Sequence, residues 1–379
     1  MNFDPTEEQQ LLAASIARFV ERDYPFATRR RIVASPEGFS RDVWKTFADM
    51  GLLGLPLPSD FGGFGGGAMD AKALMEAIGR ALIVEPWLTT VALAARLVAR
   101  AGSDAQKARV LPGVAEGRVM LAFAHAEADA RHAVMHVATR ASAQGDVFVL
   151  TGRKCAIANA HAADVLVVSA RTQGDADDRN GISLFLVERD TPGVVTHPLR
   201  MLDSTRAADV SLDGVHVSRD ALLGTIGNAL PVIEEAVDFA TALLCAEAAG
   251  TIGTANDATL DYLKTRKQFG VPIGSFQALQ HRMVDLAIEL EQVESMASLA
   301  CAAVDGERDP AQRAYTVSAA KVRIADACRR VSQESVQLHG GMGMTDELPI
   351  SHAFRRLTAI AQQFGDADHH LARLATLAP

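Results

Sequence analysis

One stretch of the sequence constrains the fold more than any other, and it lies at residues 230–264. Written as a helix, this stretch is apolar nearly all round. A helix without a broad polar face is stable only when other elements cover it. We therefore predict a long, buried helix around which the C-terminal part of the chain is organised.

The sequence that follows supplies helices to pack beside it. Apolar residues recur every three or four positions over residues 279–300, and residues 317–331 repeat the spacing. Gly306 ends the first of these patterns, and Asp309 and Pro310 provide an N-cap and a first-turn proline for the second. Long antiparallel helices beside a buried one predict a C-terminal four-helix bundle over residues 227–379.

Residues 120–226 have a different period. Short β-prone runs are separated by turn residues such as Gly145 and Gly214, and they lie at residues 147–150, 165–168, 182–187 and 210–217. The polar residues 173–181 between two of these runs predict an exposed hairpin tip. Several short strands without intervening helices indicate a small antiparallel β-barrel domain.

Residues 1–119 are predicted to form an N-terminal helical domain. Thr6 followed by Gln9 has the spacing of a capping box at the start of the first helix. The glycine cluster at residues 62–67 predicts a turn before a helix at residues 69–82. A phosphate-binding loop is the alternative, but no strand precedes it and no GKS or GKT follows it. The fold class is therefore α+β, with a helical, a β and a helical domain in that order.

Composition excludes several classes of partner. The net charge of −9 and the lack of a basic run argue against nucleic acid. The N-terminus lacks the pattern of a signal peptide, and no run approaches the roughly 20 apolar residues of a membrane span. The four cysteines lack the spacing of a metal site or a disulfide frame, and adjacent His369 and His370 face different ways on a helix. We expect a cytoplasmic protein without a metal, a membrane or a nucleic-acid partner.

Two segments of the C-terminal part could hold a phosphate. RKQFG at residues 266–270 leads into PIGSFQ at 272–277, and QLHGGMG lies at 337–343. An arginine supplies a bidentate charge, and neighbouring glycines allow backbone amides to approach a diphosphate closely. A helix cap and an ordinary interhelical turn explain each segment alone. Both together, in this three-domain layout, favour the diphosphate site.

With these motifs the chain resembles the acyl-CoA dehydrogenase family over essentially its whole length. GLLGLPLPSDFGG and LTGRKCAIANAHAADVLVVSART add to the resemblance. The family holds FAD at a dimer interface and removes two hydrogens from an acyl-CoA: a carboxylate takes the α proton and flavin N5 takes the β hydride. The resemblance thus implies an acyl-CoA substrate and an electron-transfer flavoprotein as acceptor. It also implies that the following residues contact the ADP half of a neighbouring subunit's FAD: Arg266, Gln268, Phe269, Gln277, Gln337, Leu338, Gly340 and Gly341.

The β domain departs from the family pattern at the flavin. The family's Thr-Glu-Pro-Gly-Ala-Gly-Ser-Asp turn aligns with residues 126–131, where Ala126 stands for the threonine. The family's Trp-Ile-Thr-Asn becomes AIAN, so that Ala156 and Ala158 replace the tryptophan and the threonine. Two hydroxyl donors are absent, each worth about 1 kcal/mol when buried. Because backbone amides could still bind the ring, the sequence predicts weakened flavin binding rather than its loss.

The catalytic base is the second departure. The resemblance places the family's glutamate at Gly365 or, in other members, at Ala240, and neither residue has a carboxylate. A general base must lie within hydrogen-bond reach of the proton that it removes. Asp366, one position from the first site, and Glu247, seven residues and about 10 Å beyond the second, are the candidate substitutes. For Glu247 a structural hydrogen bond at the bundle interface is the favoured alternative.

A chain with the ADP-binding segments but without the hydroxyls and the base is similar to a subgroup of the family. These are the small subunits of heteromeric acyl-CoA dehydrogenases, with pimeloyl-CoA dehydrogenase and the actinobacterial steroid side-chain enzymes among them. The resemblance implies that the chain completes the FAD site of a homologous larger subunit. A homo-oligomeric dehydrogenase, oxidase or monooxygenase using Asp366 or Glu247, and a flavin-free structural subunit, stay open.

Overall fold

The computed structural model describes residues 6–377, whose contacts divide the chain into two compact units. The predicted N-terminal helical domain, residues 1–119, does not form a unit of its own, and its residues are divided between these two units. The first unit comprises residues 1–34, 68–84 and 241–379, and the second comprises residues 35–67 and 85–240.

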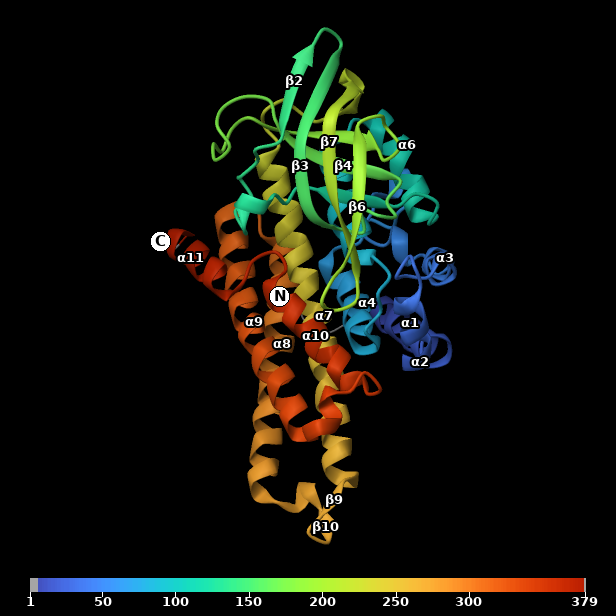
Figure 1. Cartoon of the computed structure of the whole chain (residues 1–379), viewed down its shortest axis with the longest axis vertical. Coiled ribbons are helices and arrows are strands. Elements are labelled where there is room, and N and C mark those ends of the chain that lie inside the picture. Colours follow the sequence, from blue (N-terminus) through green and yellow to red (C-terminus); the bar gives the residue numbers. More distant parts are fainter. Residues whose placement is uncertain (1–5, 378–379) are drawn as a thin grey trace. The chain divides into compact units, whose positions relative to one another are not determined.

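The first unit is helical apart from one short hairpin. Figure 1 shows α8 and α9 running alongside α7, with the hairpin of β9 (Lys267–Gln268) and β10 (Val271–Pro272) between α7 and α8. The helices are α1 (Glu7–Asp23), α2 (Phe26–Ala34), α4 (Ala68–Ala81), α7 (Leu230–Thr265, in this unit from residue 241), α8 (Gln277–Gly306), α9 (Pro310–His339), α10 (Pro349–Gln362) and α11 (Ala367–Leu377).

The N-terminal caps predicted for two helices of this unit, α1 and α9, are confirmed. Thr6 and Gln9 form the capping box of α1. The Asp309 carboxylate accepts a hydrogen bond from Ala311 N, and Pro310 is the first residue of α9. These caps satisfy backbone N–H groups that have no partner inside their own helix.

Helix α7 is long and apolar enough to cross a membrane by length and composition alone. However, 94% of its most apolar stretch is buried inside the protein. On the side facing α8, the buried Asn256 donates its side-chain amide to Leu286 O. The predicted buried helix is therefore confirmed, and its burial is that of a core helix.

Glycines allow α4 and α7 to cross in direct backbone contact. A Cβ on Gly250 would lie 1.9 Å from Glu76 O, and a Cβ on Gly79 would lie 2.0 Å from Glu247 O. The Thr251 hydroxyl donates to Gly79 O across the same crossing. Neither helix can carry a larger residue at its glycine without moving away from the other.

The second unit contains the β-sheet and the remaining helices. The helices are α3 (Arg41–Asp49), a π-helix (Leu88–Ala95), α5 (Arg96–Ala101) and α6 (Asp104–Ala115). The strands are β1 (Leu121–Ala124), β2 (Arg140–Gln144), β3 (Val147–Ala158), β4 (Val165–Arg171), β5 (Ile182–Glu188), β6 (Val194–Arg200), β7 (Arg206–Ser218) and β8 (Leu222–Leu223).

The strands form one sheet in the order β6-β7-β3-β2-β4-β5-β8, with β1 beside β4. Most neighbours are antiparallel, but β1 and β2 both pair with β4 in parallel, so the sheet is mixed rather than wholly antiparallel. Its buried face includes Phe148 and Phe185, whose ring centroids lie 5.1 Å apart. The predicted α+β class is confirmed.

The sequence did not predict β1, β2, β6 or the two-residue β8. β1 has only four residues and is buried throughout, whereas β2 and β6 are largely exposed and show no clear apolar alternation. β6 also contains Pro198, which is tolerated because β6 is an edge strand. Residues 172–181 connect antiparallel β4 and β5, as the predicted hairpin tip requires.

The glycine cluster at residues 62–67 is a turn, as predicted. Its amides are used within the chain, because Gly63 N donates to Pro58 O and Gly65 N donates to Leu57 O. A Cβ on Gly63 would lie 2.0 Å from Leu57 O, so this glycine permits a close backbone approach. These amides are therefore hydrogen-bonded within the fold and are not available to a phosphate.

We expect Gly250→Ala to lower the free energy of unfolding by about 1–3 kcal/mol, because the new methyl group forces α4 and α7 apart. The urea midpoint measures this loss. Gly253→Ala on the same helix is the control. The atoms nearest to its Cβ belong to the Arg80 guanidinium, the closest at 3.4 Å, so helix propensity should raise stability by about 0.5–1 kcal/mol. Equal stabilisation by both variants would contradict the backbone crossing.

Candidate functional site

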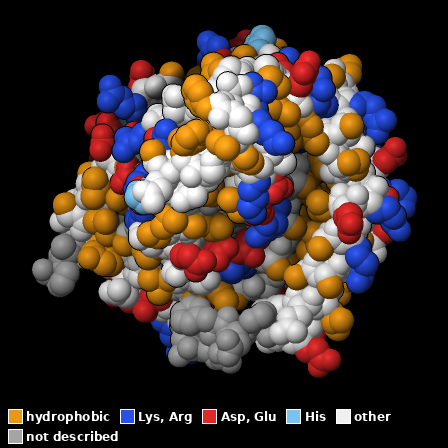
Figure 2. All heavy atoms as spheres, turned by 90° about the horizontal axis from the view of Figure 1, so that it is seen from below, with side chains coloured by type: hydrophobic (Ala, Val, Ile, Leu, Met, Phe, Trp, Pro, Cys, Tyr) orange, Lys and Arg blue, Asp and Glu red, His pale blue; other side chains and the backbone are white. Residues whose placement is uncertain are grey.

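The hairpin between α7 and α8 presents residues to solvent. Its turn contains Phe269 at φ 53° and Gly270 at φ 83°, and the Phe269 side chain is 90% exposed. Phe269 makes an edge-on contact with the half-exposed Phe276. Figure 2 views the molecule from the end at which Figure 1 shows the hairpin, and hydrophobic side chains lie there among basic and acidic ones. An exposed phenylalanine in a strained turn indicates a contact with another molecule.

The second phosphate-binding candidate begins where α9 ends. His339 is the last residue of α9, and a 3-10 helix at Gly340–Met344 follows. Cβ atoms placed on Gly340 and Gly341 would meet nothing within 4 Å. Gly340 needs to be glycine for its φ of 60°, but Gly341 has no such requirement within the chain. An unobstructed backbone at Gly341 therefore fits the close approach of an outside group.

The other predicted FAD contacts lie on these two segments. Arg266, Gln268, Gln277 and Gln337 are exposed, whereas the Leu338 side chain is only 6% exposed and packs into the bundle. Both segments belong to the first unit, and the structure links them through Tyr262 and His339, whose rings stack with centroids 4.5 Å apart. An exposed guanidinium on one segment and an open glycine backbone on the other are groups suited to a diphosphate.

The loop at the first predicted base position has no room for a side chain. Gly365 has a φ of 116°, and a Cβ there would lie 2.5 Å from His369 Cδ2 and 2.7 Å from His370 Nε2. Lys321, fully buried on α9, donates to the carbonyl oxygens of Gly365 (2.8 Å) and of Ile360 and Ala361 on α10. The loop is thus shaped by its own backbone contacts.

Asp366, the first candidate base, has a structural role. Its Oδ1 accepts a hydrogen bond from His369 N at 2.8 Å, at the start of α11. A carboxylate at this place satisfies a free backbone amide and stabilises the helix dipole.

Glu247, the second candidate, is held by an ion pair. Arg356 on α10 donates from Nε to Oε1 at 2.6 Å and from Nη2 to Oε2 at 2.8 Å. Glu247 is 4% exposed, so both oxygens are fixed in a buried bidentate contact. This is the structural interaction favoured for Glu247 from its sequence context. Ala240, the second predicted base position, is fully buried within α7.

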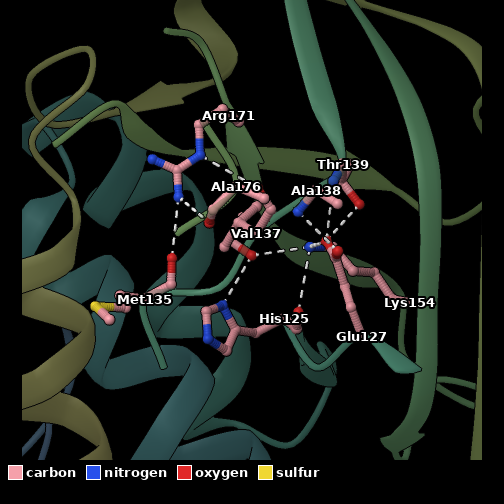
Figure 3. Close-up of polar contacts among 10 residues, drawn as sticks. His125, Glu127, Met135, Val137, Ala138, Thr139, Lys154, Arg171 and Ala176 are labelled. Carbon is pink, nitrogen blue, oxygen red and sulfur yellow. Dashed lines mark hydrogen bonds and ion pairs between the residues drawn. The ribbon is translucent and has the colours of Figure 1, made fainter. Parts of the chain in front are cut away.

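The β-domain segment aligned with the family's flavin turn contains Glu127, which forms a buried ion pair with Lys154 of β3 (Figure 3). Glu127 receives hydrogen bonds from Lys154 Nζ at 2.7 Å, from Ala138 N, and from the backbone and hydroxyl of Thr139. Burial raises the pKa of Glu127, but the Lys154 charge and these hydrogen bonds outweigh it and lower the pKa to about 2. Burial lowers the pKa of Lys154 to about 8.

Arg171 holds the residues that follow this segment together with the β4–β5 connection. Its guanidinium donates to five carbonyl oxygens, and the residue is 1% exposed. Figure 3 shows it pointing toward Met135, Val137 and Ala176. The five acceptors are the carbonyls of Met135, Val137, Ala176, Asp178 and Asn180. Sequence reasoning missed this arginine and the Glu127–Lys154 pair, although a lysine within an apolar strand pattern was a usable signal.

Strained backbone is concentrated in the segments singled out from the sequence. Among residues 6–377, seven non-glycine residues have a positive φ. Only Leu82 and Ser204 lie outside the candidate segments. The other five are Arg131, Ala156, Asn159, Phe269 and Phe364. Such conformations persist where the surroundings impose them, which is typical of functional sites and of the loops derived from them.

Three of the four cysteines lie in the core. The four cysteines are unpaired, and burial raises the pKa values of Cys245 and Cys328 to about 12, so these thiols are unreactive. Within residues 6–377, no group of histidine, cysteine and carboxylate side chains is arranged to hold a metal ion.

Known protein families match the chain in three consecutive segments. The N-terminal, middle and C-terminal domain models of acyl-CoA dehydrogenase match residues 6–118, 122–215 and 228–376, respectively. The chain therefore belongs to the acyl-CoA dehydrogenase family, whose cofactor is FAD.

Individual relatives cover nearly the whole chain. The probable acyl-CoA dehydrogenase YngJ of Bacillus subtilis is 30% identical over 99% of this chain and 98% of its own length. Among solved structures, a variant of the Tcur3481–Tcur3483 steroid ACAD has a TM-score of 0.87 at 31% identity and covers 98% of this chain and 97% of its own. The ChsE4–ChsE5 complex of Mycobacterium tuberculosis has a TM-score of 0.88 at 25% identity and covers 99% and 98%.

Restoring a glutamate at residue 365 should not create a base. We expect Gly365→Glu to lower the melting temperature, because a side chain meets His369 and His370 and the φ of 116° costs about 1–3 kcal/mol. Turnover of an acyl-CoA should stay at the wild-type level. Gln362→Glu, on the exposed end of α10, adds the same carboxylate without strain and should leave the melting temperature unchanged. A stable Gly365→Glu protein with new activity would overturn this account of the loop.

Stability should fall as the pH drops from 7 to 5. Burial and then the Lys321 charge lower the pKa of His370 to about 3, whereas the unfolded chain titrates near 6.5. Below pH 6.5 the unfolded chain therefore binds the extra proton, and stability is lost until about pH 3. We expect a loss of about 1–2 kcal/mol at pH 5 from this residue. His370→Gln should flatten the dependence of the urea midpoint on pH, and exposed His281→Gln should not. An unchanged slope in His370→Gln would contradict this assignment.

Proposed function

We propose that this chain is the base-lacking subunit of a heteromeric, FAD-dependent acyl-CoA dehydrogenase. One observation carries the proposal: neither base position has a carboxylate, and both nearby carboxylates are engaged in structural contacts. Asp366 caps α11, and Glu247 is paired with Arg356. A homologous partner must then supply the base and bind the acyl-CoA.

This chain would hold the diphosphate half of a partner's FAD with its hairpin and its glycine segment. Arg266 provides the charge, and the Gly341 backbone, where a Cβ would meet nothing within 4 Å, lets a phosphate approach closely. The Gly340 amide already donates to Gln337 O within the chain. When bound, FAD supplies the hydride acceptor of the dehydrogenation. The family resemblance extends the proposal to an electron-transfer flavoprotein as the electron acceptor, and the scattered cysteines extend it to a cytoplasmic location.

Two of the similar solved structures support a heteromeric assembly. The Tcur3481–Tcur3483 steroid ACAD and the ChsE4–ChsE5 complex each carry the names of two components. Both match this chain over nearly its whole length. A chain of this fold can therefore be expected to work beside a second, different chain. Because this chain lacks a base, the second chain would supply it.

The test is the flavin content of the chain, purified alone and after co-expression with the homologue encoded by a neighbouring reading frame. We expect little FAD on the chain alone, and about one FAD per pair of chains with acyl-CoA turnover in the complex. Arg266→Gln should lower the FAD content of the complex, because it removes the charge that faces the diphosphate. Arg308→Gln, beyond the other end of α8, is the matched control.

Amide substitutions distinguish the alternatives. In the complex, Asp366→Asn should retain turnover, since asparagine is also a good N-cap. A chain that alone carries one FAD, oxidises an acyl-CoA and loses this activity in Asp366→Asn or Glu247→Gln is a self-sufficient homomer. A complex whose FAD content does not change in Arg266→Gln contradicts the proposed contact with the cofactor.

A further inference from the structure

An aromatic contact joins the two exposed segments of the bundle. The Tyr262 ring on α7 stacks on the His339 ring at the end of α9, with centroids 4.5 Å apart and planes 25° apart. The His339 side chain is 5% exposed, whereas Tyr262 is partly exposed, so the stack lies at the edge of the buried core. Tyr262 precedes Arg266 by four residues, and His339 directly precedes Gly340 and Gly341.

The His339 ring is fixed by its own helix. Nδ1 lies 2.8 Å from Ser335 O, and because a carbonyl only accepts, the proton must be on Nδ1. Burial lowers the pKa of His339, so the ring is neutral at pH 7. A Cβ on Gly343 would lie 3.0 Å from His339 Cβ and 2.8 Å from Val336 O. Glycine at this position therefore lets the segment at Gly340–Met344 fold back against His339.

The Tyr262 side of the contact continues into the hairpin. Arg266 N donates to Tyr262 O at 2.8 Å, and Ile273 N donates to Arg266 O at 2.8 Å. A Cβ on Gly274 would lie 2.9 Å from Leu263 O, so the base of the hairpin packs directly on the end of α7. The position of the Arg266 backbone is thus tied to Tyr262 by one helical turn.

We propose that Tyr262 and His339 are positioning residues, whose stacked rings set the spacing between Arg266 and the Gly340–Gly341 backbone so that both segments bind one diphosphate. The inference rests on the proposed role of these segments in holding FAD. A diphosphate has a fixed length, so an arginine and a set of amides act on it together only when their separation is held. The stack joins the ends of α7 and α9, and its His339 ring is buried, so it can hold that separation from beneath the exposed segments.

The experiment compares His339→Leu with His339→Phe in the FAD-containing assembly. The leucine variant removes the ring, and we expect it to raise the Kd for FAD about three- to tenfold, the range for loss of one aromatic pair. The phenylalanine variant keeps a ring and should stay within about twofold of the wild type. Tyr262→Leu and Tyr262→Phe form the matched pair on α7. Melting temperatures of the same variants report any general loss of stability.

Coupling to Arg266 separates positioning from a merely structural role. If the stack positions Arg266, the effect of His339→Leu on the Kd should largely disappear in an Arg266→Gln background. Additive effects, or equal losses in the leucine and phenylalanine variants, would overturn the inference. If Arg266→Gln alone leaves the Kd unchanged, the proposed function fails first. If Arg266→Gln weakens binding and His339→Leu does not, only the positioning role fails.

Discussion

The structure depends on covering a helix that has almost no polar face. In the first unit, α7 meets α4 through glycines in backbone contact, α8 through Asn256, and α10 through the Glu247–Arg356 pair. Each contact comes from a different helix, so the arrangement of the bundle follows from how α7 is buried. The hairpin follows as well, because α7 ends at Thr265 and the chain must turn there to start α8.

Buried charges in both units are matched by specific partners. Lys321 has three carbonyl acceptors, Arg171 has five, and Lys154 has Glu127. A buried charge without a partner costs several kcal/mol, so each of these groups is committed to the fold. The same principle applies to Glu247, whose carboxylate is already satisfied by Arg356. A carboxylate in such a pair cannot take up a substrate proton without breaking the contact that stabilises it.

Much of the fold could be predicted from the sequence, because α7, α8 and α9 have long apolar patterns and α9 has a clear N-cap. β2 and β6 could not, since their exposed residues lack apolar alternation and their position depends on neighbouring strands. The segments proposed to bind a diphosphate were recognisable from Arg266 and the glycines. The Tyr262–His339 stack was not, because it joins residues 77 positions apart and depends on how α7 and α9 pack. The roles of Asp366 and Glu247 likewise required their partners to be known.

The absence of a carboxylate at residue 365 and the presence of the segments proposed to bind a diphosphate do not conflict energetically, since they depend on different contacts. The loop at Gly365 is held by Lys321 and His370, whereas the hairpin is held by Tyr262, Leu263 and its own hydrogen bonds. None of the first set of contacts includes a residue of the second. A change at residue 365 can therefore remove a base while the cofactor-facing surface keeps its shape. This separation is what a division of labour between two homologous subunits requires.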